Sequence, residues 1–158
     1  VETAKIEEGS NVAIFGAGCV GLSVVQGAVQ RKAGKIIVVD LNPNKKEWAE
    51  KFGATDFLNP SELKHQSVQE KLIEMTDGGC DYTFDCTGNV GVMRAALEAC
   101  HKGWGQSIVI GVAAAGQEIS TRRKIWLRFM FPNDRTNQLF SISTCYRPRL
   151  EGMCFRWY

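Results

Sequence analysis

Long hydrophobic runs are absent from this chain, and no apolar stretch approaches the about 20 residues needed to cross a bilayer. The first residues also lack the basic start and apolar centre of a signal peptide. These absences exclude a membrane-spanning protein and predict a cytoplasmic one without a membrane partner. The 158 residues are 44% hydrophobic and 23% charged, which is the composition of an ordinary globular domain with one sizeable core.

Histidine is scarce, and the six cysteines form no CxxC pair. His65 lies in a polar loop and His101 follows a predicted helix, and neither has a cysteine or an acid at zinc-ligand spacing. We therefore expect two surface histidines and predict no metal site in this chain. Cys80, Cys86 and Cys100 lie beside or inside apolar segments, where free cysteine packs as a small hydrophobe, so a disulfide framework is not expected.

A strong net charge is also absent, but the total of +2 hides an uneven distribution. Residues 1–121 hold 11 basic and 15 acidic side chains, whereas residues 122–158 hold 8 basic and 2 acidic ones. The change predicts one folded domain over 1–121 followed by a divergent basic tail, in which Lys124–Phe131 has the composition of a strand. A basic tail can bind nucleic acid, but the chain contains no recognisable nucleic-acid module, and we predict no such partner.

Apolar strands alternate with helical segments between Asn11 and Val112. The expected strands are Val12–Phe15, Lys35–Val39, Thr55–Leu58, Tyr82–Asp85 and Ser107–Ile110. Alternation of this kind produces right-handed crossovers and a parallel sheet that is covered by helices on both faces. The sequence therefore predicts an α/β fold, a doubly wound parallel sheet of Rossmann type with strand order 3-2-1-4-5. Its ligand should lie at the carboxyl ends of the first and fourth strands.

Start and stop signals locate the helices. Asn42 followed by Pro43 is typical of a helix N-terminus, and Gly53 of the residue just past a helix end. Ser67 and Glu70 have the spacing of a capping box. The predicted helices are Val20–Lys32, the segment between Pro43 and Gly53, Val68–Thr76 stopped by Asp77-Gly78-Gly79, and Val90–Cys100 capped by Asn89.

A glycine-rich turn follows the first predicted strand. The run Gly16-Ala17-Gly18-Cys19-Val20-Gly21 has GxGxxG spacing between a strand and a helix. Its glycines permit the tight turn, the approach of a pyrophosphate to the backbone, and close packing of the helix on the sheet. Free N–H groups near Cys19 and Val20 would face the phosphates. The alternative is a glycine-rich turn that binds nothing.

The acid Asp40 ends the second predicted strand and indicates which cofactor is bound. A carboxylate there can accept hydrogen bonds from both hydroxyls of the adenosine ribose and would repel a 2′-phosphate, so we predict NAD rather than NADP. The strand order brings Thr87 and the run Ile110, Gly111, Val112 to the same crevice. A methyltransferase, which can also place a glycine turn and a strand-end acid around an adenosine, is another interpretation.

At these residues the sequence resembles the medium-chain, zinc-dependent alcohol dehydrogenases. The segments that carry the resemblance are EEGSNVAIFGAGCVGLSVVQGA, VVDLNPNKKEWAEKFGATDFLNP and GGCDYTFDCTGNVGVMRAALEACHKGWGQSIVIGVAAAGQEISTR. The last segment is most similar to the class III branch, the S-(hydroxymethyl)glutathione or glutathione-dependent formaldehyde dehydrogenases. The resemblance covers about residues 1–122 and falls on the coenzyme domain of that family.

The resemblance implies a role for each candidate residue. Gly16–Gly21 would hold the pyrophosphate, Asp40 would bind the adenosine ribose, and Lys45 would assist near that ribose. Thr87 would line the adenine side of the cleft, and the residues 110–112 would flank the nicotinamide. Lys45 has the alternative interpretation of a solvated surface lysine, and Ile110 and Val112 that of core packing.

In the complete family enzyme a hydride passes between an alcohol, or a glutathione adduct, and NAD. The zinc ligands and the proton relay of the family belong to a separate catalytic domain that lies mostly N-terminal to the coenzyme domain. We therefore predict no catalytic residues and no zinc ligands in this chain, and a catalytically inactive nucleotide-binding fragment is the alternative function. The family forms homodimers, but the resemblance stops after Arg122, before the segment that would pair two subunits, which puts dimerisation in doubt.

Overall fold

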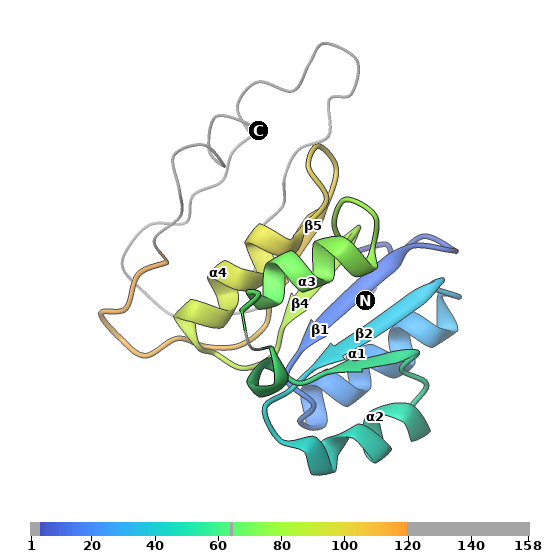
Figure 1. The fold of residues 1–158 in the computed structure, drawn as a ribbon, viewed down its shortest axis with the longest axis horizontal. Coiled ribbons are helices and arrows are strands. Elements are labelled where there is room, and N and C mark those ends of the chain that lie inside the picture. The colour runs from blue at the N-terminus through green and yellow to red at the C-terminus, as the bar shows by residue number, and fades with distance from the viewer. Residues whose placement is uncertain (1–3, 64, 120–158) are drawn as a thin grey trace, which may run out of the picture.

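Five parallel strands form one sheet in the computed structural model, which describes residues 4–63 and 65–119 (Figure 1). The strands are β1 Asn11–Phe15, β2 Lys35–Val39, β3 Asp56–Leu58, β4 Tyr82–Asp85 and β5 Gln106–Val109. Their order is β3-β2-β1-β4-β5, which confirms the predicted topology with the short third strand at one edge. Phe15 pairs with both Val39 and Asp85, so the strands end level with one another at a common carboxyl edge.

Helices cover both faces of this sheet. The helical elements are α1 Cys19–Gln30, η1 Pro43–Lys45, α2 Lys46–Lys51, η2 Pro60–Glu62, α3 Val68–Met75 and α4 Val90–Ala99. In Figure 1, α1 and α2 lie on one side of the strands, and α3 and α4 on the other. Val12 and Ile14 of β1 belong to the core beneath α1, whereas Ala13 and Phe15 belong to the core beneath α3 and α4. Alternate side chains of one strand therefore fill two cores, and the doubly wound fold is confirmed.

The helices begin where the capping residues predicted them. The Asn42 side chain accepts a hydrogen bond from the Asn44 N–H at 3.0 Å, and the Ser67–Glu70 capping box is complete. Asn89 accepts hydrogen bonds from the first turn of α4. Gly53 follows the end of α2 with φ +104°, a conformation that a residue with a Cβ rarely adopts.

Some boundaries differ from the prediction by one or two residues. The first helix ends at Gln30 rather than at Lys32, because Lys32 has φ +56° and leaves the helical path. The segment after Pro43 begins as the 3-10 turn η1 and becomes α-helical only at Lys46. The last strand ends at Val109, which pairs with Asp85, instead of at Ile110.

Several predictions from the sequence lie outside the described residues. They are the basic tail over 122–158, its expected strand at Lys124–Phe131, and the cysteines Cys145 and Cys154. Within residues 4–63 and 65–119, no helix combines the length and the apolar character that crossing a membrane requires. A cytoplasmic location stays a prediction.

Candidate functional site

The turn between β1 and α1 is in close backbone contact with the first turn of α1. Gly16 has φ +96°, and its N–H donates to the Val39 carbonyl at 2.8 Å, which holds the turn against β2. A Cβ added to Gly21 would overlap the carbonyl oxygen of Gly16. Gly21 is therefore required by the packing of α1 on the turn, as its predicted role demands.

Gly18 stands in the opposite situation. It is the N-cap residue of α1 with φ −84°, and a Cβ built on it would meet no atom within 4 Å. No described side chain caps this helix end, and Cys19 and Val20 in the first turn are exposed. The backbone N–H groups at the start of α1 thus face open space, where an anion can bind them and the positive end of the helix dipole.

Asp40 follows β2 and is tied to the glycine turn. Its Oδ2 accepts hydrogen bonds from the Ala17 N–H at 2.8 Å and from Lys45 Nζ at 3.1 Å, and its Oδ1 accepts from the Asn42 N–H at 2.8 Å. Burial alone would raise the pKa of Asp40, but the hydrogen bonds from Asn42, Ala17 and Lys45 outweigh it and lower the pKa. Asp40 is therefore an anion at neutral pH, and Lys45 is its ion-pair partner rather than an unpaired surface lysine.

The loop after β4 is organised by a residue to which sequence reasoning gave no function. Asp85, the last residue of β4, is completely buried, and its carboxylate accepts hydrogen bonds from the N–H and the hydroxyl of Thr87 and from the Gly88 N–H. Thr87 itself is exposed at the strand ends. The available signal was an acid at the end of an apolar strand, the same pattern that singled out Asp40.

The loop after β5 packs against the same residue. The N–H groups of Ile110 and Gly111 donate to the Asp85 carbonyl at 2.9 and 3.0 Å. The two apolar candidates differ, since Ile110 packs against the core beneath α1, whereas Val112 is 69% exposed. Core packing therefore accounts for Ile110, and Val112 stays available to a ligand. The predicted residues from β1, β2, β4 and β5 all lie along one edge of the sheet.

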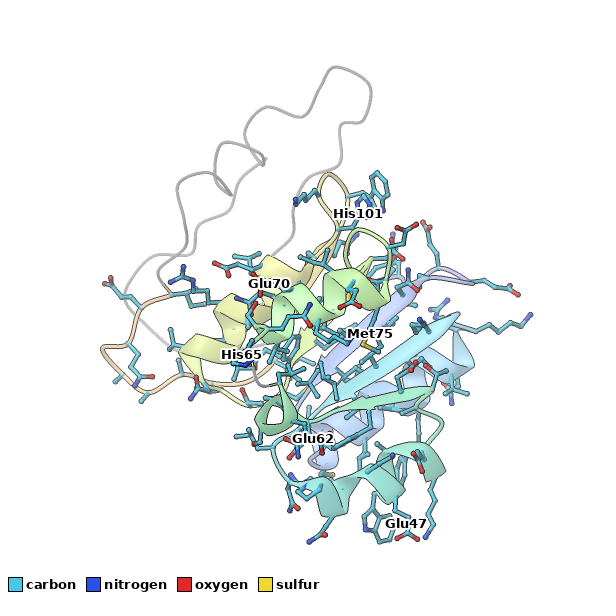
Figure 2. The ribbon with its side chains drawn as sticks, viewed as in Figure 1. Glu47, Glu62, His65, Glu70, Met75 and His101 are labelled. Atoms are coloured by element: carbon cyan, nitrogen blue, oxygen red, sulfur yellow. The ribbon has the colours of Figure 1, made fainter. Side chains whose placement is uncertain are left out.

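The two histidines lie apart from each other and from any group of metal ligands. His65 is exposed, as predicted, but His101 is partly buried because its ring stacks on Trp104 with ring centroids 3.6 Å apart (Figure 2). Over the described ranges, no three or more histidine, cysteine or acidic side chains come together in a way that could hold a metal ion. A zinc ion of the kind that the resemblance implies for the complete enzyme therefore does not fit this part of the chain.

The described cysteines are free thiols. Cys80 and Cys100 are buried, Cys86 is partly buried, and Cys19 is exposed. Burial raises the pKa of the Cys80, Cys86 and Cys100 thiols to about 12. These three residues are therefore inert core thiols at neutral pH, in agreement with their predicted role as small hydrophobes.

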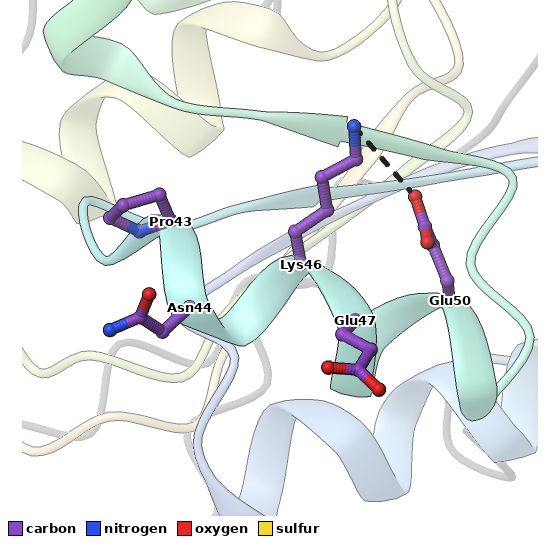
Figure 3. Close-up of a pocket in the computed structure, with 5 residues that line it drawn as sticks. All are labelled: Pro43, Asn44, Lys46, Glu47 and Glu50. Atoms are coloured by element: carbon purple, nitrogen blue, oxygen red, sulfur yellow. Dashed lines mark ion pairs between the residues drawn. The ribbon is translucent and has the colours of Figure 1, made fainter.

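A hollow of about 560 Å³ lies along η1 and α2 and does not coincide with the strand-end residues (Figure 3). It is lined by Pro43, Asn44, Lys46, Glu47 and Glu50, and Lys46 pairs with Glu50 across it at 3.9 Å. None of these residues is a predicted ligand contact, and the hollow opens widely to solvent. The strand ends, with their uncapped helix, the buried Asp85 and the partly buried Asp40, remain the better candidate.

Comparison with known proteins gives the family of the chain. The sequence model of a family described as zinc-binding dehydrogenase matches residues 19–140. The chain is 79% identical over 120 residues to an S-(hydroxymethyl)glutathione dehydrogenase of Aspergillus oryzae, covering 76% of this chain and 31% of that protein. It is 65% identical over 124 residues to the enzyme of the same name from Saccharomyces cerevisiae, covering 77% of this chain and 32% of that protein. The chain thus spans about a third of the length of these relatives.

Solved structures share the fold. The 2R,3R-butanediol dehydrogenase of Bacillus subtilis matches with a TM-score of 0.74 and 26% identity, over 92% of this chain and 38% of that one. The benzyl alcohol dehydrogenase of Acinetobacter calcoaceticus matches with a TM-score of 0.72 and 29% identity, over 78% of this chain and 33% of that one. The chain therefore belongs to the zinc-binding dehydrogenase family, and its described residues have the fold of that family's coenzyme domain.

Proposed function

We propose that this chain binds NAD and serves as the coenzyme-binding part of an alcohol or S-(hydroxymethyl)glutathione dehydrogenase. The observation that carries the proposal is the open space at Gly18, in front of the uncapped start of α1 and beside the anion Asp40. Nothing among the described residues requires a glycine at this position, whereas a pyrophosphate that contacts the backbone does. The names of the similar dehydrogenases supply the substrate class.

Asp40 supports NAD over NADP. Its carboxylate is ionised and accepts three hydrogen bonds from protein groups, which leaves one of its four lone pairs for a ribose hydroxyl. A 2′-phosphate in the same place would bring a second negative charge against Asp40, and the cation Lys45 is already paired with that carboxylate.

The remaining candidates would hold the two ends of the cofactor. Thr87 and Val112 are exposed. We assign Thr87 to the adenine side, and Val112 with the backbone of Gly111 to the nicotinamide side. When bound, NAD supplies the carbon that accepts a hydride from the alcohol. The described residues bind and orient the cofactor, and they offer no cluster of ligands to a zinc ion.

A second candidate function is a nucleotide-binding fragment without activity. The observation that favours it is that no described residues form a set of metal ligands. Both candidates bind NAD, and they are separated by whether an alcohol or glutathione-adduct substrate is oxidised. The binding proposal is therefore the one to test first.

Calorimetric titration of the chain with NAD, NADP and S-adenosylmethionine tests the proposal. We expect NAD to bind and NADP to bind at least about tenfold more weakly, as the loss of one hydrogen bond to a charged group requires. Circular dichroism on the same sample shows that the chain is folded. Failure of a folded chain to bind NAD would contradict the proposal, and tighter binding of S-adenosylmethionine would favour a methyltransferase.

Cys19 provides an independent probe of where NAD binds. We expect iodoacetamide at about pH 8 to alkylate the exposed Cys19, while Cys80, Cys86 and Cys100, with pKa values of about 12, react slowly. NAD at ten times its Kd should slow the reaction of Cys19 about tenfold, because the occupied site shields the thiol. Peptide mapping by mass spectrometry follows each cysteine separately. An unchanged rate at saturating NAD would show that the cofactor lies elsewhere.

A further inference from the structure

Asp85 is an acidic residue whose side chain has no exposed surface. It lies at the end of β4, at the carboxyl edge of the sheet where the candidate site is located. Burying a carboxylate costs free energy unless hydrogen bonds replace the lost water. Here Oδ1 accepts from the Thr87 hydroxyl at 2.7 Å and the Thr87 N–H at 3.2 Å, and Oδ2 accepts from the Gly88 N–H at 3.3 Å. A residue buried in this way cannot touch a ligand, so any effect it has on binding must pass through the groups that it holds.

The first of these groups is the Thr87 side chain. Its hydroxyl donates to Asp85 and accepts from the Asn89 N–H at 3.2 Å, which fixes the rotamer. The methyl group is then directed at the glycine turn, since a Cβ built on Gly16 would lie only 2.9 Å from Thr87 Cγ2. Asp85 thereby sets the distance between the loop after β4 and the turn after β1.

The second group is the loop after β5. The Asp85 carbonyl accepts from the N–H groups of Ile110 and Gly111, and a Cβ on Gly111 would lie 2.6 Å from Asp85 Oδ2. A Cβ on Gly88 would in turn lie 2.6 Å from the Val112 carbonyl oxygen. The two loops thus meet backbone to backbone beside the Asp85 side chain, and both are hydrogen-bonded to Asp85.

We propose that Asp85 is a positioning residue that holds the Thr87–Gly88 and Ile110–Val112 loops in their NAD-binding arrangement, an inference that rests on the proposed binding of NAD. The carboxylate can do this because both of its oxygens are acceptors and the hydrogen-bond donors of the β4 loop converge on them. An amide of the same size presents a donor to at least one of those N–H groups. The two loops then separate, and the residues at the adenine end and at the nicotinamide end of the proposed site are no longer correctly spaced for NAD.

The test compares Asp85→Asn with Asp81→Asn. Asp81 precedes the opposite end of β4 and accepts comparable hydrogen bonds, from the Asn11 N–H at 2.8 Å and from Trp104 Nε1 at 3.0 Å. Calorimetry of the full chain with NAD, at a temperature where both variants are folded, should show a Kd raised at least about tenfold for Asp85→Asn, as expected for loss of a hydrogen bond to a charged group. Asp81→Asn should stay within about twofold of the parent chain.

Two substitutions at Thr87 separate positioning from general stability. Thr87→Val keeps the methyl group and loses the hydroxyl bond to Asp85, whereas Thr87→Ser keeps that bond. We expect Thr87→Val to raise the Kd for NAD and Thr87→Ser to lie closer to the parent chain. Combined with Asp85→Asn, the effect of Thr87→Val should be far smaller than it is alone, because both changes remove the same interaction.

The outcomes distinguish failure of the positioning role of Asp85 from failure of the proposed NAD binding. If the parent chain binds NAD but Asp85→Asn binds it equally well, the positioning role is overturned while NAD binding stands. If Asp85→Asn does not fold, an unchanged Kd in Thr87→Val overturns the role instead. If the folded parent chain does not bind NAD, the proposed function itself fails. Additive effects of Asp85→Asn and Thr87→Val on the Kd also contradict the proposal.

Discussion

Replacing Gly18 with alanine is expected to abolish tight NAD binding in a chain that still folds. The Cβ would meet no described atom within 4 Å, and φ −84° suits alanine, so nothing in the folded chain resists it. The cost in unfolding free energy should be about 1 kcal/mol or less, from the poorer N-cap. The same Cβ stands where the pyrophosphate approaches, and losing one or two charge-assisted hydrogen bonds raises the Kd for NAD about a hundredfold.

Gly21→Ala is the matched change, one turn further along the same helix. Its Cβ would overlap the Gly16 carbonyl oxygen, so α1 must move away from the turn. We expect a loss of about 3 kcal/mol in unfolding free energy, at the upper end of overpacking effects because the obstacle is backbone. Urea unfolding followed by circular dichroism measures the stability of both variants, and calorimetry measures their binding.

The contrast between the two glycines is what identifies a ligand site. If Gly18→Ala binds NAD as tightly as the parent chain, the space at Gly18 does not hold the pyrophosphate, and the turn has only a structural purpose. If Gly21→Ala is as stable as the parent chain, α1 can move away from the turn at no cost, and the contact with Gly16 does not restrict it. The first result would contradict the binding proposal, and the second would contradict the packing argument.

Asp40→Ala is expected to weaken NAD binding by about tenfold to a hundredfold, the range for losing a hydrogen bond to a charged acceptor. The alanine also releases the Ala17 N–H and Lys45, which both donate to Oδ2. Freed from its partner, Lys45 becomes available to a 2′-phosphate. The preference for NAD over NADP should therefore fall further than the affinity for NAD itself, because binding of NADP improves at the same time. Calorimetric titration with both cofactors measures the ratio.

Asp56→Ala is the control for this change. Asp56 begins β3, away from the carboxyl edge of the sheet, and accepts a hydrogen bond from the Thr55 hydroxyl at 2.7 Å. Its loss should leave the Kd for NAD within about twofold. An NAD to NADP ratio that is the same in Asp40→Ala and the parent chain would mean that Asp40 does not select the cofactor.

Local signals were sufficient where each element depends on its own residues. The Ser67–Glu70 capping box, the Asn89 cap and the positive φ of Gly53 all occur at the predicted places, because caps and turns are short-range interactions. The helix ends and the last strand boundary were less well predicted. Whether Lys32 continues a helix, or Ile110 a strand, is decided by neighbours that are distant in the sequence.

The candidate site shows the same division between features that depend on neighbouring residues and features that depend on residues distant in the sequence. The glycine spacing and Asp40 could be chosen from the sequence because they belong to one contiguous strand–turn–helix–strand motif, whereas Lys45 was implied only by the family resemblance. Only the tertiary structure shows the ion pair of Lys45 with Asp40 and the difference between the partly buried Ile110 and the exposed Val112. The positioning role that we propose for Asp85 was not predicted, since its contact with the loop after β5 at Gly111 forms only when β4 and β5 pair.

The sequence by itself determined the α/β fold, the order of the strands and the edge at which a ligand is expected, because hydrophobic alternation and chirality leave few other arrangements. The tertiary structure supplied the contacts behind the glycine roles that the GxGxxG spacing predicted, namely the overlap of a Cβ on Gly21 with Gly16 and the open space at Gly18. It also decided that a buried carboxylate joins two loops of the candidate site. These properties depend on distances between strands that are neighbours in space and not in sequence, and no local pattern encodes such distances.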